Sequence, residues 1–328
     1  MMRHGLGSPN SAMSDPNTRR RRTAWSLCTL LLLSVAACRE EPRAPADAVP
    51  EPVAAVQAMA RAVAEDDLLA YARLAVPPAQ YARLRQAWQE GDSRWPLTEL
   101  PLHDQLLPML QSLSAPDAGA SLQRSFERQL AGQTTAVRQA AQSLGLFGVQ
   151  YLQHQQGMTA SQQAHYIDVV KTLAEWGAQA PISDRARARA SIAALTRAAA
   201  ATGISDDAHL QAAGMEDSLQ RLSPFLGTLA AVLATYGLDV DASLRGITGD
   251  VLSREGDNAL VRLQYPLAGR TITVQVPLTR RDGQWYLTRT LADTDALLRR
   301  FDAARAAAPA VATPAEVAED EQQPPAGP

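Results

Sequence analysis

The sequence predicts an α+β protein in which a mainly helical domain is followed by a small α+β domain with a four-stranded antiparallel meander. In residues 53–236 apolar residues recur every three or four positions, which is the spacing of amphipathic helices. From residue 247 the period shortens to two, which is the spacing of strands with one buried face. We therefore expect a helical domain over residues 53–213 and an α+β domain over residues 214–305.

The helical domain should begin with a helix that carries Val53, Val56, Ala60 and Val63 on one face. Adjacent prolines at positions 77 and 78 should end one helix and begin the next, because proline suits the first helical turn. Further stripes at helical spacing are Tyr81, Leu84 and Trp88; Val137, Ala140, Ala141, Leu144, Phe147 and Tyr151; Tyr166, Val169, Val170, Leu173 and Trp176; Ile192 and Leu195; and Leu222, Phe225, Leu226, Leu229, Leu233 and Tyr236.

Local signals mark several ends of these helices. Thr159 and Gln162 match a capping box, and Ser183 is expected to cap the following helix. Residues 95–101 should form an irregular connection. Gly145 and Gly148 interrupt the stripe around residue 144, and we expect them to allow close helix–helix packing, with a groove for a partner helix as the alternative.

The meander is expected in residues 247–290, with a short helix at 293–305 after it. Asp282 and Gly283 predict a tight hairpin turn, since both tolerate positive φ, and residues 284–290 should be the last strand. The first strand is expected at 247–254 and its turn at 255–258. The alternating apolar residues of the middle strands are Ala259, Val261, Leu263 and Tyr265, and Ile272, Val274, Val276 and Leu278.

A helix that leads into a meander ending in Asp-Gly-Gln-Trp-Tyr-Leu, residues 282–287, is similar to small α+β domains of the nuclear-transport-factor-2-like kind. The resemblance covers about a quarter of the chain. Because such domains support many functions, it implies a fold and no particular activity.

Residues 1–37 have the parts of a secretory signal peptide, whether translation starts at Met1 or Met13. Four arginines at positions 19–22 precede a short apolar run, residues 25–35. That run is shorter than the roughly 20 residues that span a bilayer, which favours a cleaved signal.

The end of the apolar run, Val35-Ala36-Ala37-Cys38, resembles the lipobox of bacterial lipoproteins. The resemblance implies cleavage before Cys38 and attachment of lipid to its sulfur. In that family an aspartate after the cysteine favours the inner membrane, so Arg39 implies the periplasmic face of the outer membrane. An ordinary secretory signal with a chance cysteine is the alternative.

The residues next to the lipidated Cys38 and at the other end of the chain have the composition of unfolded segments. Residues 38–52 should form a proline-rich tether and residues 306–328 a disordered tail. Removal of residues 1–37 leaves 26 basic and 33 acidic residues, a net charge of −7, which argues against nucleic acid as a partner. With Cys28 removed and Cys38 lipidated, no thiol remains for a disulfide or a metal.

No catalytic motif is found in the sequence, and we expect no catalytic residue, cofactor or metal site. The motifs of serine hydrolases, phosphate-binding loops and zinc helices are absent. The four remaining histidines, which are expected on the surface or at helix caps, are His103, His154, His165 and His209. Asp239 to Ser243 lacks the glycine and glutamate of a calcium loop, so a turn and helix cap is expected there.

Two acidic groups, residues 65–67 and the pair Glu216 and Asp217, keep a carboxylate-based hydrolase open as the alternative function. Tryptophans at 88, 95, 176 and 285 are expected in the core, with Trp95 as the candidate for an exposed contact. We expect a non-catalytic lipoprotein that binds another protein or an envelope component, one form of which is an immunity or inhibitor protein.

Overall fold

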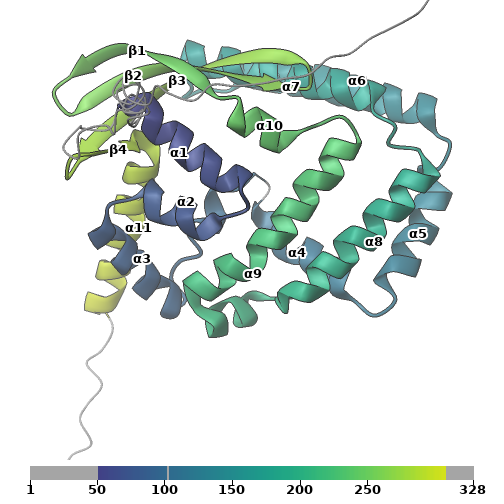
Figure 1. Ribbon diagram of the computed structural model, residues 1–328, viewed down its shortest axis with the longest axis horizontal. Helices are drawn as coiled ribbons and strands as arrows, with labels where there is room; N and C mark the ends of the chain where they lie inside the picture. The colour runs from purple at the N-terminus through teal and green to yellow at the C-terminus, as the bar shows by residue number, and fades with distance from the viewer. Residues whose placement is uncertain (1–50, 102, 308–328) are drawn as a thin grey trace, which may run out of the picture. The chain divides into compact units, whose positions relative to one another are not determined.

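The computed structural model describes residues 51–101 and 103–307, and the expected signal peptide, Cys38, most of the tether and almost all of the tail lie outside them. The described residues form eleven α-helices, one 3₁₀ helix and one antiparallel sheet (Figure 1). Their bounds are α1 Pro52–Ala64, α2 Leu68–Ala75, α3 Pro78–Gln89, η1 Leu97–Glu99, α4 His103–Ser114, α5 Ala118–Gln129, α6 Thr134–His154, α7 Ala160–Gln179, α8 Arg185–Thr202, α9 Asp207–Thr235, α10 Val240–Arg245, β1 Thr248–Glu255, β2 Asn258–Leu267, β3 Arg270–Arg281, β4 Gln284–Leu287 and α11 Thr288–Ala307.

The predicted α+β class, with helices first and a four-stranded antiparallel meander after them, is confirmed. The strands follow one another in the order β1-β2-β3-β4. Cross-strand pairs such as Val261 with Val276 and Leu263 with Val274 place the alternating apolar residues on one face. Asp282 and Gly283 both have positive φ, as the hairpin turn requires.

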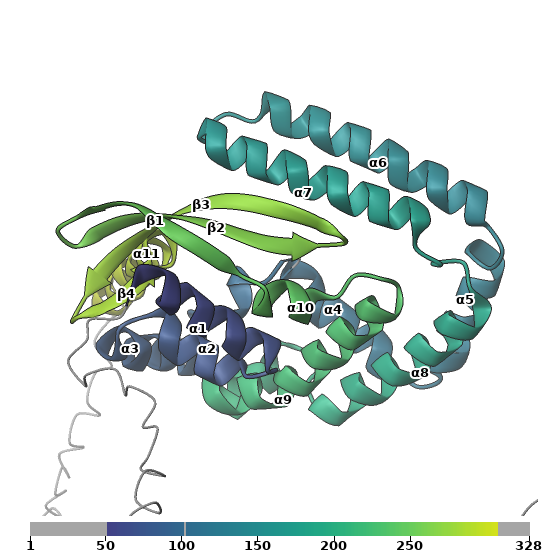
Figure 2. The same cartoon turned by 45° about the horizontal axis from the view of Figure 1, so that its top comes forward.

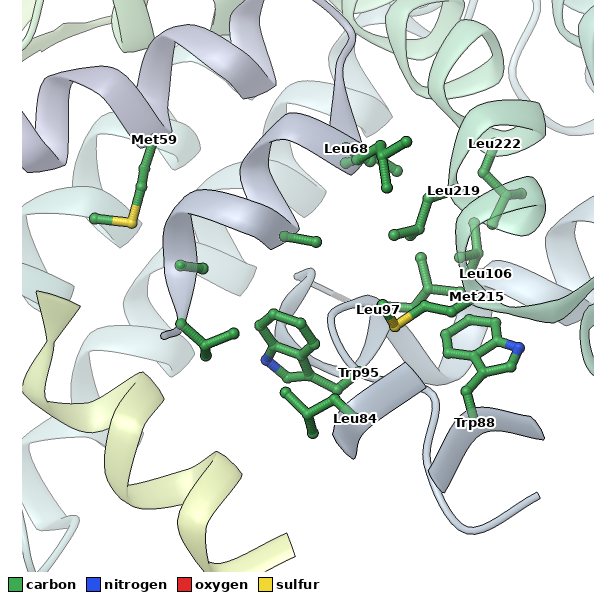
Figure 3. Close-up of a cluster of buried hydrophobic side chains, with 14 of the residues drawn as sticks. Met59, Leu68, Leu84, Trp88, Trp95, Leu97, Leu106, Met215, Leu219 and Leu222 are labelled. Carbon is green, nitrogen blue, oxygen red and sulfur yellow. The ribbon is translucent and has the colours of Figure 1, made fainter. Parts of the chain in front are cut away.

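The main core lies between the first helices, α9, the inner face of the sheet and α11. Figure 3 shows Leu84, Trp88, Trp95, Met215 and Leu219 converging in it. The indole Nε1 of Trp88 donates a hydrogen bond of 3.0 Å to the carbonyl oxygen of Leu210, so this large side chain is buried without an unpaired donor.

The expected domain boundary at residues 213 and 214 falls inside α9. Gly214 has a φ of 76°, so the helix kinks there. Leu210 before the kink and Met215 after it belong to the same apolar core. The division into two domains stays a prediction.

Two expectations about local structure are wrong. The last strand ends at Leu287 instead of residue 290, and α11 begins directly after it at Thr288. The chain is helical from Thr288 onward because Leu291, Leu298 and Phe301 recur at helical spacing and pack into the core. Asp184, not Ser183, caps α8, because its carboxylate accepts the N–H of Arg187.

Trp95 lies in the core, as expected for the tryptophans, and does not form the exposed contact that was its alternative. Its side chain is 2% exposed. Its indole Nε1 donates to Glu99 at 2.8 Å. The connection of residues 95–101 therefore folds inward and contains the short helix η1.

Candidate functional site

Helices α6 and α7 form an antiparallel hairpin that is held together by small side chains. Gly145 lies against Ala174, and a Cβ on Gly148 would be 3.0 Å from Cγ1 of Val170. Later residues of α6 contact earlier residues of α7, so the two helices run antiparallel. The close packing expected for Gly145 and Gly148 is therefore observed, because glycine leaves room for the facing helix.

The turn between the two helices is locally specified. Thr159 Oγ1 accepts the N–H of Gln162 at 3.2 Å, and Gln162 Oε1 accepts the N–H of Thr159 at 3.0 Å. This is the capping box predicted from the sequence. Gly157, with a φ of 88°, supplies the left-handed residue that the turn needs.

Helix α7 attaches the hairpin to the sheet. Glu175 forms an ion pair of 2.7 Å with Arg270, and the Nδ1 of His165 lies 3.2 Å from the carbonyl oxygen of Thr273. Figure 2 shows the hairpin above the sheet and α1 and α10 below it. Helix α6 is thus joined to the fold mainly through α7.

The outer side of α6 exposes large apolar side chains to solvent. Leu144, Phe147 and Tyr151 are 70%, 68% and 57% exposed, and Leu146 is 75% exposed. Of the 21 residues in α6, only Gly145 is buried. We call the row Val137, Ala140, Leu144, Phe147 and Tyr151 the α6 stripe. A helix of this composition normally turns such a row inward, so the exposed row is the candidate site.

A groove of about 610 Å³ lies along another side of the same hairpin. Its apolar lining comes from Gly145, Leu146 and Val149 of α6 and from Ala174 and Ala178 of α7. Charged and amide side chains form the rest of its lining: Arg138, Gln142, Lys171, Glu175 and Gln179. A groove thus lies beside Gly145, and its use by a partner helix, the alternative for the two glycines, stays a prediction.

The four histidines bind separate neighbours. The contacts of their ring nitrogens are His103 with Asp104, His154 with the carbonyl of Gln150, His165 with the carbonyl of Thr273, and His209 with Asp206. Within residues 51–101 and 103–307 no group of three or more His, Cys, Asp or Glu residues could hold a metal ion. Asp239 caps α10 by accepting the N–H of Ala242 at 2.8 Å, in agreement with the expected turn and cap.

The acidic groups also make structural contacts. Asp67 caps α2, and Asp217 forms an ion pair of 2.7 Å with Arg221. Glu216 accepts a hydrogen bond of 2.7 Å from the Tyr81 hydroxyl. That hydrogen bond, together with Arg73, lowers the pKa of Glu216. A lowered pKa favours the charged form at neutral pH, which suits an ion pair and not a proton donor.

A cluster of hydrogen-bonding side chains that the sequence did not reveal surrounds the carboxylate of Glu99. Its two oxygens accept from the Tyr71 hydroxyl at 2.7 Å and from Trp95 Nε1 at 2.8 Å, and Thr290 lies 3.5 Å away. Burial, followed by the charge of Glu99, raises the pKa of Tyr71. No sequence signal could have found the whole cluster, because Tyr71 and Thr290 are far from Glu99 in the chain and the four residues belong to no motif.

A second, polar groove of about 330 Å³ lies between α3, α11 and the β3–β4 turn. Two of its carboxylates are already paired, Asp295 with Arg281 at 2.7 Å and Asp302 with Arg83. These pairs tie α11 to the sheet and to α3.

Comparison with known proteins identifies no relative: no family model, curated protein or solved structure matches the chain. Among the described helices, none has the length and apolar character needed to cross a membrane. The residues themselves therefore carry the functional argument.

Proposed function

We propose that the protein is a lipid-anchored periplasmic lipoprotein without catalytic activity, which binds another protein through the α6–α7 hairpin. The observation that carries this proposal is the exposure of Leu144, Phe147 and Tyr151 along one row of α6. Isolated apolar side chains are common on surfaces, but a continuous row on one helix is typical of an interface.

The energetics support this interpretation. Full burial of one large apolar side chain contributes about 1.5–3 kcal/mol. Leu144, Phe147 and Tyr151 are 57–70% exposed, so a partner that covers them would recover a little over half of this amount for each side chain, before the costs of association.

The proposed location in the bacterial envelope is supported by the sequence. The apolar run and Val35-Ala36-Ala37-Cys38 support cleavage and lipidation, and Arg39 supports the outer membrane. Labelled palmitate should enter the wild-type protein and not the Cys38→Ala variant. Label that persists in the variant, or wild-type protein recovered without lipid, would contradict the anchor.

A more specific form of the proposal is an immunity or inhibitor protein that protects the periplasm against a secreted toxin or a cell-wall hydrolase. An anchored protein with a binding surface and no catalytic motif suits that task. The alternative, a carboxylate-based cell-wall or sugar hydrolase, has less support, because Glu216 and Asp217 are engaged with tyrosine and arginine side chains.

The binding role is tested with the full-length chain in bacterial membranes, solubilised in a mild detergent and separated by native electrophoresis. The wild type should migrate as a complex, and the Leu144→Glu/Phe147→Glu variant should migrate as the single chain. The matched control is Gln139→Glu/Gln150→Glu, which adds the same charge to exposed polar positions of the same helix. Wild-type protein that migrates as a single chain would overturn the proposal.

A further inference from the structure

The α6 stripe has the spacing of a coiled-coil seam. Its residues Val137, Ala140, Leu144, Phe147 and Tyr151 are separated by three, four, three and four positions. A repeat of this kind places one narrow apolar row along a helix, which is the row that a second helix covers. His154, the last residue of α6, continues the same spacing.

Among the residues that the structure describes, no other helix or strand covers the seam. Contacts with α7 come from a neighbouring row, in which Gly145 meets Ala174, Gly148 meets Val170 and Ala141 meets Gly177. Side chains at 144, 147 and 151 point away from that contact and are exposed. Helix α6 therefore packs against α7 through one row of residues and leaves the neighbouring row, the α6 stripe, exposed.

We propose that a second copy of this chain covers the seam, with the two α6 helices packed antiparallel in a symmetric dimer. This inference rests on the proposed binding function and names its partner. A symmetric contact requires a surface that is complementary to itself, both in the sizes of its side chains and in its charge.

The sizes are complementary when the helices are antiparallel and centred between Leu144 and Phe147. Leu144 of each copy then lies opposite Phe147 of the other. The small Ala140 lies opposite the large Tyr151, and Val137 lies opposite His154. In the Ala140–Tyr151 layer a small residue faces a large one, which helps to fill that layer as close-packed helices require.

The charges also permit self-association. Residues 139–153 contain no ionisable side chain except the Tyr151 phenol, so no like charges meet at the seam. In the antiparallel arrangement the two Arg138 residues are separated by about 15 residue steps, or roughly 22 Å along the helices. That exceeds the Debye length of about 8 Å at physiological salt, so the two arginines do not oppose the contact.

The surface area that the contact between the two α6 helices would bury predicts a weak dimer. An aromatic side chain buries roughly 150–250 Å² when it is fully covered. Leu144, Phe147 and Tyr151 are 70%, 68% and 57% exposed, so together they can remove about 400 Å² per copy. A total of about 800 Å² is below the standard size of specific interfaces and in the range of weak contacts. Confinement of both copies to one membrane would raise their effective concentration and favour pairing.

The test places the photo-crosslinker p-benzoylphenylalanine at Phe147 of the full-length chain, in cells that produce two copies with different epitope tags. Irradiation should give an adduct that carries both tags, with the linkage near Leu144 of the other copy. The same probe at Tyr151 should link near Ala140. At Gln139, on the polar side of α6, it should give little adduct.

A further variant tests the seam itself. With the probe at Tyr151, Leu144→Glu should lower the adduct yield by roughly tenfold or more, because two carboxylates would be buried without partners. Adducts that contain only a different protein would overturn the dimer and leave the proposed binding function intact. No adduct from Phe147 or Tyr151 would overturn both, and a linkage between the two 147 positions would overturn the antiparallel arrangement.

Discussion

Gly145 of α6 lies so close to Ala174 of α7 that a methyl group on the glycine would overlap the Cβ of the alanine. This contact sets the distance between the two helices. It also determines which row of α6 is covered and which is left in solvent.

Gly145→Ala should loosen the hairpin. Overpacking costs about 1–3 kcal/mol, which exceeds the helix propensity of roughly 1 kcal/mol that alanine gains over glycine. We expect faster hydrogen exchange of the α6 amides and unchanged exchange in α9. Gly119→Ala is the control, since a Cβ there meets nothing within 4 Å, and it should slow or preserve exchange in α5. Unchanged exchange in α6 would contradict the contact.

Leu219→Ala and Leu144→Ala remove the same atoms from different surroundings. Leu219 is fully buried in the core, so its loss should lower the free energy of unfolding by about 2–5 kcal/mol. Leu144 is exposed, and its loss should change the stability of the isolated chain by less than about 0.5 kcal/mol. Denaturant unfolding at low protein concentration measures both. Similar losses from the two variants would show that α6 is not exposed as described.

Glu216→Gln should destabilise the protein only where the carboxylate is charged. The pKa of Glu216 is lowered in the folded protein. Its contribution to stability is therefore present above the pKa of the unfolded state, and it is lost as the pH falls through the pKa of the folded state. The side chain is partly exposed, so we expect a loss of about 1 kcal/mol at pH 7, which shrinks at pH values below 4.5. Urea unfolding across this range measures it.

Asp217→Asn is the matched control for Glu216→Gln. Asp217 forms an exposed pair with Arg221 one helical turn away, and such pairs contribute about 0.3–0.5 kcal/mol. An equal effect of the two variants at pH 7 would show that the Tyr81 hydrogen bond adds nothing.

Metal ions should not change stability. No three ligands converge in the described residues, so no site is available whose occupation would stabilise the folded state by mass action. Thermal unfolding of the full chain with chelator, with zinc and with calcium should give one midpoint. A rise of several degrees with one metal, lost in His154→Ala/His165→Ala, would instead support a metal-dependent function.

The sequence alone determined those features that depend on neighbours along the chain. The change of period from helix to strand predicted the fold class, Asp282 and Gly283 predicted the hairpin turn, and Thr159 with Gln162 predicted the start of α7. Each of these depends on backbone preferences and hydrogen bonds within a few residues, which tertiary packing did not override.

Only the tertiary structure decided which apolar residues are buried. The stripes around Leu144 in α6 and Leu222 in α9 have the same helical spacing, but Leu222 is in the core and Leu144 is in solvent. An exposed contact was the alternative for Trp95, and only the tertiary structure shows this side chain buried against Glu99. Amphipathic spacing predicts which face of a helix is apolar, but it does not identify the segment that covers this face. Burial depends on segments distant in the sequence, and among the described elements α6 packs chiefly against α7.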